Sequence, residues 1–237
     1  MIINPYRFAV AGFNGFGNAS RSFDGNDYIN TNTTFESVFQ SSFSISTWVR
    51  FNDGIPPSAQ MVFGSQTATP VNRVALFIDN AGALTFGYFS NQNQGRAEID
   101  QNFSNGDTGW FHYTAVIEPT GITVYKDGLV QTLDATDDGD MSAVTMGDFE
   151  SNLDFYIGAR NINGSADNEI TGKLADFRIY DTDLSASDIA DLYAGTDVQT
   201  NLVGWWLTDT DDVLDYAGTN DGTNNGSTYD NTDAPNL

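Results

Sequence analysis

Short runs of strand-forming residues alternate with clusters of Gly, Asn, Asp and Ser from residue 22 to about residue 180. The clearest apolar runs are residues 44–51, 73–78, 84–89 and 111–117. β-Branched and aromatic residues favour strands, and the residue types between the runs favour turns. The number of such runs predicts an all-β chain with two packed antiparallel sheets.

One pair of runs carries a strong local hairpin signal. Residues 122–125 and 129–130 are apolar and flank Lys126-Asp127-Gly128. Asp-Gly between two apolar runs is typical of a tight turn, because both positions adopt positive φ at low cost. The pattern predicts a hairpin with its tip at Asp127.

One segment has helical rather than strand periodicity, at residues 183–193. Asp183 or Ser185 can cap its first turn, and Gly195 follows as a stop signal. Its apolar positions repeat at helical spacing; they are Ile189, Leu192 and Tyr193. We predict one short helix near the C-terminus.

The length of 237 residues is compatible with one all-β domain. Residues 1–21 are predicted to be an N-terminal arm, because Pro5 favours extended backbone and several glycines follow. Residues 22–237 are predicted to form the domain, with residues 200–237 completing the sandwich. That last segment is rich in Asp, Asn, Gly and Thr, but Trp205 and Trp206 can anchor it.

The charge is strongly acidic: 32 Asp and Glu residues against 9 Lys and Arg give a formal net charge of -23. Nucleic acid and anionic membranes are therefore disfavoured as partners, because both need clustered cations. The chain has no cysteine, which excludes disulfides and thiolate chemistry. No apolar run is long enough to span a bilayer, and the first residues lack the pattern of a secretory signal peptide.

Several segments together resemble the laminin G-like jelly-roll family, which shares its sandwich with pentraxins and legume-type lectins. The similar segments occur in the family's order, at residues 22–29, 43–50, 110–116, 122–130, 155–160 and 172–180, with the 183–193 helix after them. The resemblance implies a concanavalin A-like, two-sheet antiparallel jelly-roll sandwich.

One departure from the family concerns its opening strand. Family members usually begin with a strand ahead of the Phe-Asp-Gly segment, but nothing before Ser22 looks like that strand. Residues 201–207 and 215–223 do resemble it, although they follow the closing helix. We therefore predict a permuted arrangement. The alternative is the start of a second domain, but so short a segment cannot bury a core by itself.

The resemblance also implies a cofactor. Relatives often hold a calcium ion with Asp or Asn oxygens, which suit a hard cation. Asp24 and Asp27 in the opening motif and Asp176 in the closing motif would supply such ligands here. The family's usual acid at position 175 is replaced by Ala175, which weakens the match.

Sandwiches of this kind include glucan hydrolases, which resemble one another in a Glu-x-Asp-x-x-Glu strand motif that supplies two catalytic carboxylates. This chain offers Glu98 and Asp100, but Phe103 stands where the second Glu belongs. A hydrocarbon ring cannot donate a proton, so we predict that the chain is not an enzyme. The single histidine, His112, lies in an alternating strand and is predicted to be a packing residue.

Two adjacent tryptophans are the candidate contact residues. Because side chains alternate along a strand, Trp205 and Trp206 must point in opposite directions. One ring is therefore predicted to face outward or into a groove between elements, where it could contact a ligand or a partner.

Three functions follow as hypotheses. The first is a non-enzymatic virion surface protein, in capsid decoration or a tail, with a lectin-like adhesion domain that docks onto other virion proteins or neighbouring copies. The second is a carbohydrate-binding lectin module outside a virion, whose partners are cell-surface glycans. The third is a glucan hydrolase. The first two place the protein at a virion surface or outside a cell, as an oligomer or part of a larger assembly.

Overall fold

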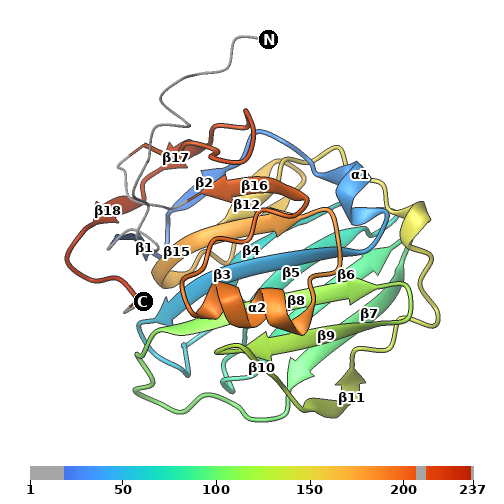
Figure 1. The fold of residues 1–237 in the computed structure, drawn as a ribbon, viewed down its shortest axis with the longest axis horizontal. Helices are drawn as coiled ribbons and strands as arrows, with labels where there is room; N and C mark the ends of the chain where they lie inside the picture. The colour runs from blue at the N-terminus through green and yellow to red at the C-terminus, as the bar shows by residue number, and fades with distance from the viewer. Residues whose placement is uncertain (1–18, 207–211, 236–237) are drawn as a thin grey trace.

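The computed structural model describes residues 19–206 and 212–235, and over these ranges the chain forms two sheets packed face to face (Figure 1). The prediction of a two-sheet antiparallel sandwich is confirmed. The predicted N-terminal arm, residues 1–21, lies almost wholly outside the described residues, and its last two residues already belong to the first strand.

Within the described residues, one sheet has eight strands, seven of them in a continuous order and β16 paired to β15. Across the sheet they are β10 (Leu129–Val130), β9 (Gly121–Lys126), β8 (Phe111–Glu118), β3 (Phe43–Phe51), β15 (Thr171–Tyr180), β1 (Ser20–Asp24) and β18 (Thr228–Asp230), with β16 at Leu202–Trp206.

The other sheet has ten strands in the same described ranges. In order they are β11 (Leu133–Asp138), β7 (Asn93–Ile99), β6 (Leu84–Ser90), β5 (Arg73–Ile78), β4 (Gln60–Gln66), β12 (Tyr156–Ile157), β2 (Tyr28–Asn30) and β17 (Thr223–Asn225), with β13 (Arg160–Ile162) and β14 (Ser165–Asp167) attached beside β4. The β13–β4 pair is parallel, and the others are antiparallel.

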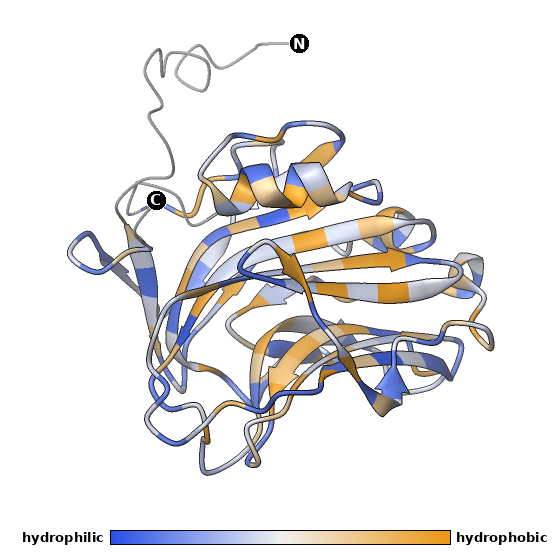
Figure 2. Cartoon of the chain, turned by 60° about the horizontal axis from the view of Figure 1, so that its bottom comes forward, coloured by the Kyte–Doolittle hydropathy of each residue, from blue (hydrophilic) through white to orange (hydrophobic). Residues whose placement is uncertain are grey.

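The inner faces of the two sheets form the core. In β9, for example, Ile122 and Val124 are buried, while Thr123 between them is half-buried. Figure 2 shows the same alternation as hydrophobic and hydrophilic bands along the strands. Phenylalanine dominates the buried contacts, as with Phe63, which contacts Phe86, Phe155 and Phe177. Burial of each such ring contributes about 1.5 to 3 kcal/mol to the stability of the fold, which has no disulfides.

The C-terminal segment is built into both sheets. β16 pairs with β15, β18 pairs with β1, and β17 pairs with β2 in the opposite sheet. One edge of β15 is divided: β1 pairs with residues 171–174 and β16 with residues 177–180. The strand from the C-terminal segment thus continues the sheet where β1 ends.

Two helices lie outside the sheets in the described part of the chain, one more than the sequence predicted. The predicted helix is α2 (Ala186–Tyr193), which begins after Ser185 with a capping box between Ser185 and Asp188. The second, α1 (Glu36–Phe39), is one turn long and was not predicted, because four residues show no periodicity. A 3-10 turn, η2 (Met146–Asp148), completes the helical elements. Within the same ranges, no helix combines the length and the apolarity that a bilayer crossing requires.

Candidate functional site

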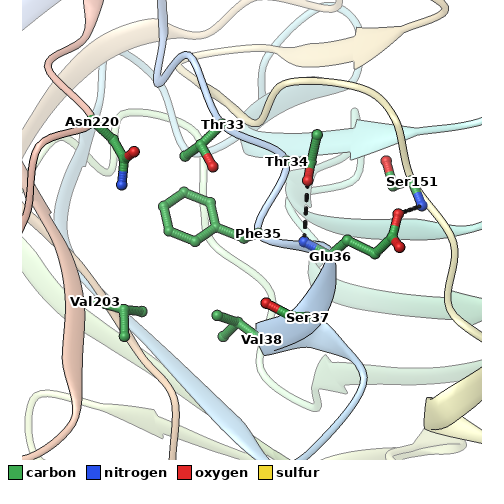
Figure 3. A pocket seen from close by; sticks show the side chains of 9 residues that line it. All are labelled: Thr33, Thr34, Phe35, Glu36, Ser37, Val38, Ser151, Val203 and Asn220. Carbon is green, nitrogen blue, oxygen red and sulfur yellow. Dashed lines mark hydrogen bonds between the residues drawn. The ribbon is translucent and has the colours of Figure 1, made fainter.

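An open pocket of about 600 Å³ lies where α1 meets the C-terminal segment. Figure 3 shows Asn220 and Val203 on one side, Thr34, Glu36 and Ser151 on the other, and the Phe35 ring between them. Its full lining is Thr33, Thr34, Phe35, Glu36, Ser37, Val38, Ser151, Val203 and Asn220. The pocket therefore spans the seam between the main jelly roll and the segment after α2.

Phe35 forms the floor of this pocket and has an uncommon backbone. Its φ is 53°, in the left-handed region that bulky residues rarely adopt. Its carbonyl accepts hydrogen bonds from the amides of Val38 and Phe39, and its ring meets Trp206 edge-on at 5.8 Å. The core contact holds the strained residue in place, and such strain concentrates at functional sites.

The wall beside α1 is polar. The Glu36 carboxylate accepts a hydrogen bond of 2.8 Å from the amide of Ser151, and the amide of Glu36 donates to the Thr34 hydroxyl. The first contact joins the α1 turn to the loop that follows η2, and the second is local to the start of α1. The side chains of Thr33, Thr34 and Ser37 add hydroxyl groups to the same lining.

The opposite wall is fixed by a buried carboxylate. Asp215 has no exposed surface, and its two oxygens accept hydrogen bonds from the amides of Trp205, Ala217 and Asn220 at 3.0–3.1 Å. The carbonyl of Asn220 accepts from the indole N–H of Trp206 at 3.0 Å. Because both backbone groups of Asn220 are held, its side chain keeps its place at the rim.

The pocket combines hydroxyl groups, one amide and one carboxylate with the apolar surfaces of Phe35, Val38 and Val203. Hydroxyls and amides both donate and accept hydrogen bonds, which suits sugar hydroxyls, and the apolar walls suit the C–H faces of a sugar ring. Glu36 is the one ionisable residue of the lining. A pair of carboxylates for glycoside cleavage is therefore missing from these lining residues.

Two of the three predicted calcium ligands, Asp24 and Asp27, lie side by side, and Asp176 lies apart from them. Asp24 is exposed and lies opposite Thr171 at the start of β15, whereas Asp176 is buried in the middle of that strand. Asp27 accepts a hydrogen bond from the Asp24 amide. In the described ranges, no group of three or more His, Asp or Glu side chains is placed to hold a metal ion. Calcium binding stays a prediction, which a melting curve unchanged by EDTA would remove.

Asp176 has a structural environment of its own. It sits where the pairing of β15 passes from β1 to β16, with a φ of 51°. Its carboxylate accepts from Arg178 Nε at 2.9 Å and from Trp205 Nε1 at 2.6 Å. Burial raises the pKa of this carboxyl, and Arg178 and Trp205 oppose that shift. Burial lowers the pKa of Arg178, but Asp176 and Tyr180 together more than offset this, so the pKa is raised.

The adjacent tryptophans point to opposite faces, as predicted, but neither ring is exposed. Trp206 lies in the core and is 0% exposed. Trp205 lies between elements and is 6% exposed, with the Arg178 guanidinium 4.1 Å from its ring centre and Tyr216 beside it. Trp205 thus occupies a groove that the chain itself fills. Contact of either ring with a ligand or partner stays a prediction.

His112 is buried on the outer side of the eight-stranded sheet, under α2. Its Nε2 lies 2.8 Å from the Ser46 hydroxyl, and its ring packs against Trp48 at 5.1 Å. Burial lowers the pKa of His112 to about 3, and the positive charge of Arg178 adds to the shift. A histidine with so low a pKa is neutral at physiological pH, and burial keeps its ring from solvent. Both features agree with the predicted packing role.

This pKa predicts a loss of stability in acid. Below pH 6.5 the unfolded chain binds a proton at His112 that the folded chain does not bind, so stability falls as the pH drops from 6.5 toward 3. Between pH 7 and pH 5 the expected loss is about 2 kcal/mol. Urea unfolding at both pH values measures it, and His112→Gln is the control that should lack this component. An imidazole NMR signal titrating near pH 6.5 in the folded protein would contradict the prediction.

The three residues of the glucanase-like motif have different environments in the fold. Glu98 on β7 accepts a hydrogen bond from the Thr85 hydroxyl at 2.9 Å, and Asp100 is exposed beyond the strand end. Phe103 packs against Phe51 and Phe111 at the edge of the core. The position that a second catalytic carboxylate would need is thus a packing position.

Sequence reasoning missed most of the pocket. Asn220 lies in the Asp, Asn and Gly-rich stretch that was noted for its resemblance to an opening strand, but nothing in it singles out that residue. Phe35 and Glu36 carry no motif, and their role depends on a contact with residues far along the chain. The one local signal is Thr34 two residues before Glu36, which is typical of a turn that starts a helix.

A comparison with protein families finds one match: the model of the concanavalin A-like lectin/glucanases superfamily matches residues 23–190. A comparison with curated proteins finds no match. The segment that supplies Val203 and Asn220 lies beyond the family match.

Solved structures share the fold at low sequence identity. A candidate carbohydrate-binding protein from Bacteroides ovatus is similar with a TM-score of 0.66 and 19% identity, over 93% of this chain and 61% of that one. The chain therefore spans about three fifths of that protein's length. A heptameric SAP-like pentraxin from Limulus polyphemus has a TM-score of 0.59 and 15% identity, over 89% of this chain and 94% of that one. The CBM40 of an IT-sialidase from Ruminococcus gnavus has a TM-score of 0.58 and 10% identity, over 75% of this chain and 97% of that one.

Proposed function

The chain belongs to the concanavalin A-like lectin/glucanase superfamily, and from this premise we propose that it is a non-catalytic carbohydrate-binding module that holds a neutral glycan in the pocket beside α1. The observation that carries the proposal is the lining of that pocket, which combines hydroxyls, an amide and apolar walls around the Phe35 ring. Similar folds in proteins described as carbohydrate-binding add support.

The charge of the pocket favours a neutral ligand. No Lys or Arg is among the residues that line it, and Glu36 contributes a carboxylate. An acidic sugar would be repelled by that carboxylate, and the surrounding protein with its net charge of -23 would add to the repulsion. Sugar hydroxyls, in contrast, can donate to Glu36 and exchange hydrogen bonds with Thr33, Thr34 and Asn220.

The absence of a carboxylate pair supports binding without cleavage. Hydrolysis of a glycosidic bond needs an acid and a second carboxylate on opposite sides of the bond. Within the pocket lining only Glu36 is ionisable, and one of its oxygens is already bound by Ser151. Glu98 and Asp100, the residues of the glucanase-like motif, lie outside this lining.

We expect Asn220→Ala to weaken glycan binding by about tenfold, because it removes about two hydrogen bonds of about 0.5 to 1 kcal/mol each from the rim. The measurement starts from an array of neutral oligosaccharides probed with the wild-type protein. Isothermal titration with the best ligand then compares wild type and variant.

The matched control is Asn102→Ala, an exposed asparagine outside the pocket lining, which should leave affinity unchanged. Both variants should keep the wild-type melting temperature, since the backbone contacts of Asn220 remain. If the wild type binds no neutral glycan, or if Asn220→Ala binds as well as the wild type, the proposal is wrong.

A virion surface stays a prediction about where the module works, and so do its docking partners. The strongly acidic composition, which favours a solvated and repulsive surface, is what supports it. Mass spectrometry of purified particles is the test, and particles without the chain would count against it.

A further inference from the structure

Three arginines lie together on the outer face of the ten-stranded sheet: Arg73 on β5, Arg96 on β7 and Arg160 on β13. The chain has nine basic residues in all, so a third of its basic charge gathers on this face. The three arginines belong to the sheet that α2 does not cover. None of them lines the pocket beside α1.

The strand register places Arg73 and Arg96 diagonally across neighbouring rows of one face. Gln66 of β4 pairs with Arg73, Arg73 pairs with Phe89 of β6, and Gly87 of β6 pairs with Arg96. Paired residues of neighbouring strands point to the same face. Because Val74, Leu76, Phe86 and Tyr88 belong to the core, the residues that alternate with them face outward. The amide oxygen of Gln66 accepts a hydrogen bond of 2.9 Å from Arg160, which places Arg160 beside the residue that pairs with Arg73.

Arg73 differs from its two neighbours in its counter-charge. Arg96 is paired with Asp137 and Arg160 with Asp167. The guanidinium of Arg73 has no ion pair or hydrogen bond to any other described residue, and its buried Nε lacks a partner there. It lies over the Phe89 ring, 3.9 Å from the ring centre. It also rests on Gly87, where an added Cβ would come within 2.7 Å of Nη2.

A half-buried guanidinium without a counter-charge lowers the stability of the folded protein. Burial lowers the pKa of Arg73 to about 10, and the charges of Arg160 and Arg96 add to the shift. The protein has 32 acidic residues, and yet none of those described forms an ion pair with this cation. Glu98, the acid on the same face of β7, is bound to Thr85 instead. A missing counter-ion in so acidic a chain points to a site where a ligand supplies it.

We propose that Arg73, flanked by Arg96 and Arg160, is a second binding site that takes the carboxylate of an acidic sugar. A guanidinium matches a planar carboxylate with two parallel hydrogen bonds. A ligand with one negative charge fits better than a polyanion, because the net charge of -23 repels highly charged chains. The choice of a sugar as the carrier of the carboxylate rests on the proposed function, whereas the anion site itself does not.

The test compares 3′-sialyllactose with lactose, which differ only by an acidic sugar, and adds free glucuronate as a small carboxylate probe. We expect the wild type to bind 3′-sialyllactose at least tenfold more tightly than lactose at low salt, and the preference to shrink as salt is added. Arg73→Gln should lose the preference. Arg50→Gln, an arginine of the other sheet that is paired with Asp233, is the matched control and should keep it.

Stability gives a second readout. Because Arg73 is a half-buried cation without a partner among the described residues, Arg73→Gln should melt at the wild-type temperature or above it. Equal wild-type affinity for both sugars, an intact preference in Arg73→Gln, or a clear drop in its melting temperature would each overturn the site. Asn220→Ala should leave the acidic preference intact. Failure of the neutral-glycan pocket and failure of this site are therefore distinguishable.

Discussion

Deletion of residues 200–237 is expected to leave a chain that aggregates instead of folding. The deletion removes Trp206 from the core, where it contacts Phe35 and Phe177, and strips β16 from the edge of β15. It also leaves β1 and β2 without their partners β18 and β17, so that both sheets gain an open edge. Exposed strand edges beside exposed aromatic core promote association between chains. Solubility on expression and size-exclusion chromatography measure the outcome.

Point variants measure how much of this effect comes from the Trp206 ring. Trp206→Ala removes only the ring and is expected to lower the free energy of unfolding by about 3 to 5 kcal/mol. Trp206→Phe keeps part of the packing and should lose less. Leu129→Ala is the control, because Leu129 is 71% exposed at the end of a sheet and its truncation should cost less than about 0.5 kcal/mol. A soluble, cooperatively unfolding truncated chain would show that the C-terminal segment is dispensable.

The sequence predicted those elements whose signals are local. The hairpin tip is correct because Asp127 and Gly128 both have positive φ, at 52° and 75°, as the Asp-Gly pair implied. The helix begins after Ser185, one of the two caps considered, because the Asp188 side chain returns the hydrogen bond and completes a capping box. In both cases the residues that decide the structure are within a few positions of each other.

The parts that sequence reasoning missed depend on contacts between distant segments. One ring of the neighbouring Trp205 and Trp206 was expected to face outward or into a groove between elements, and alternation alone cannot decide between the two. The ring of Trp205 lies in such a groove and is covered, because Tyr216 packs beside it and the Arg178 guanidinium lies over it. The pocket is similar: its floor comes from Phe35, and its far wall from Asn220. No periodicity or spacing encodes such a meeting.

The second large effect is expected at the buried ion pair beside this seam. Arg178→Met should lower the free energy of unfolding by about 3 to 5 kcal/mol, because it leaves the Asp176 carboxylate buried without a cation, and Trp205 Nε1 is then its remaining hydrogen-bond donor among the described residues. Asp176→Asn should lose less: Asn accepts the left-handed backbone at this position, and Arg178 keeps Asp197 at 2.9 Å. The double variant should lose less free energy of unfolding than the sum of the two single variants, because it does not leave the Asp176 carboxylate buried without its cation. Urea unfolding followed by tryptophan fluorescence measures all three, and an Arg178→Met protein within 1 kcal/mol of wild type would mean that the pair does not hold β15 and β16 together.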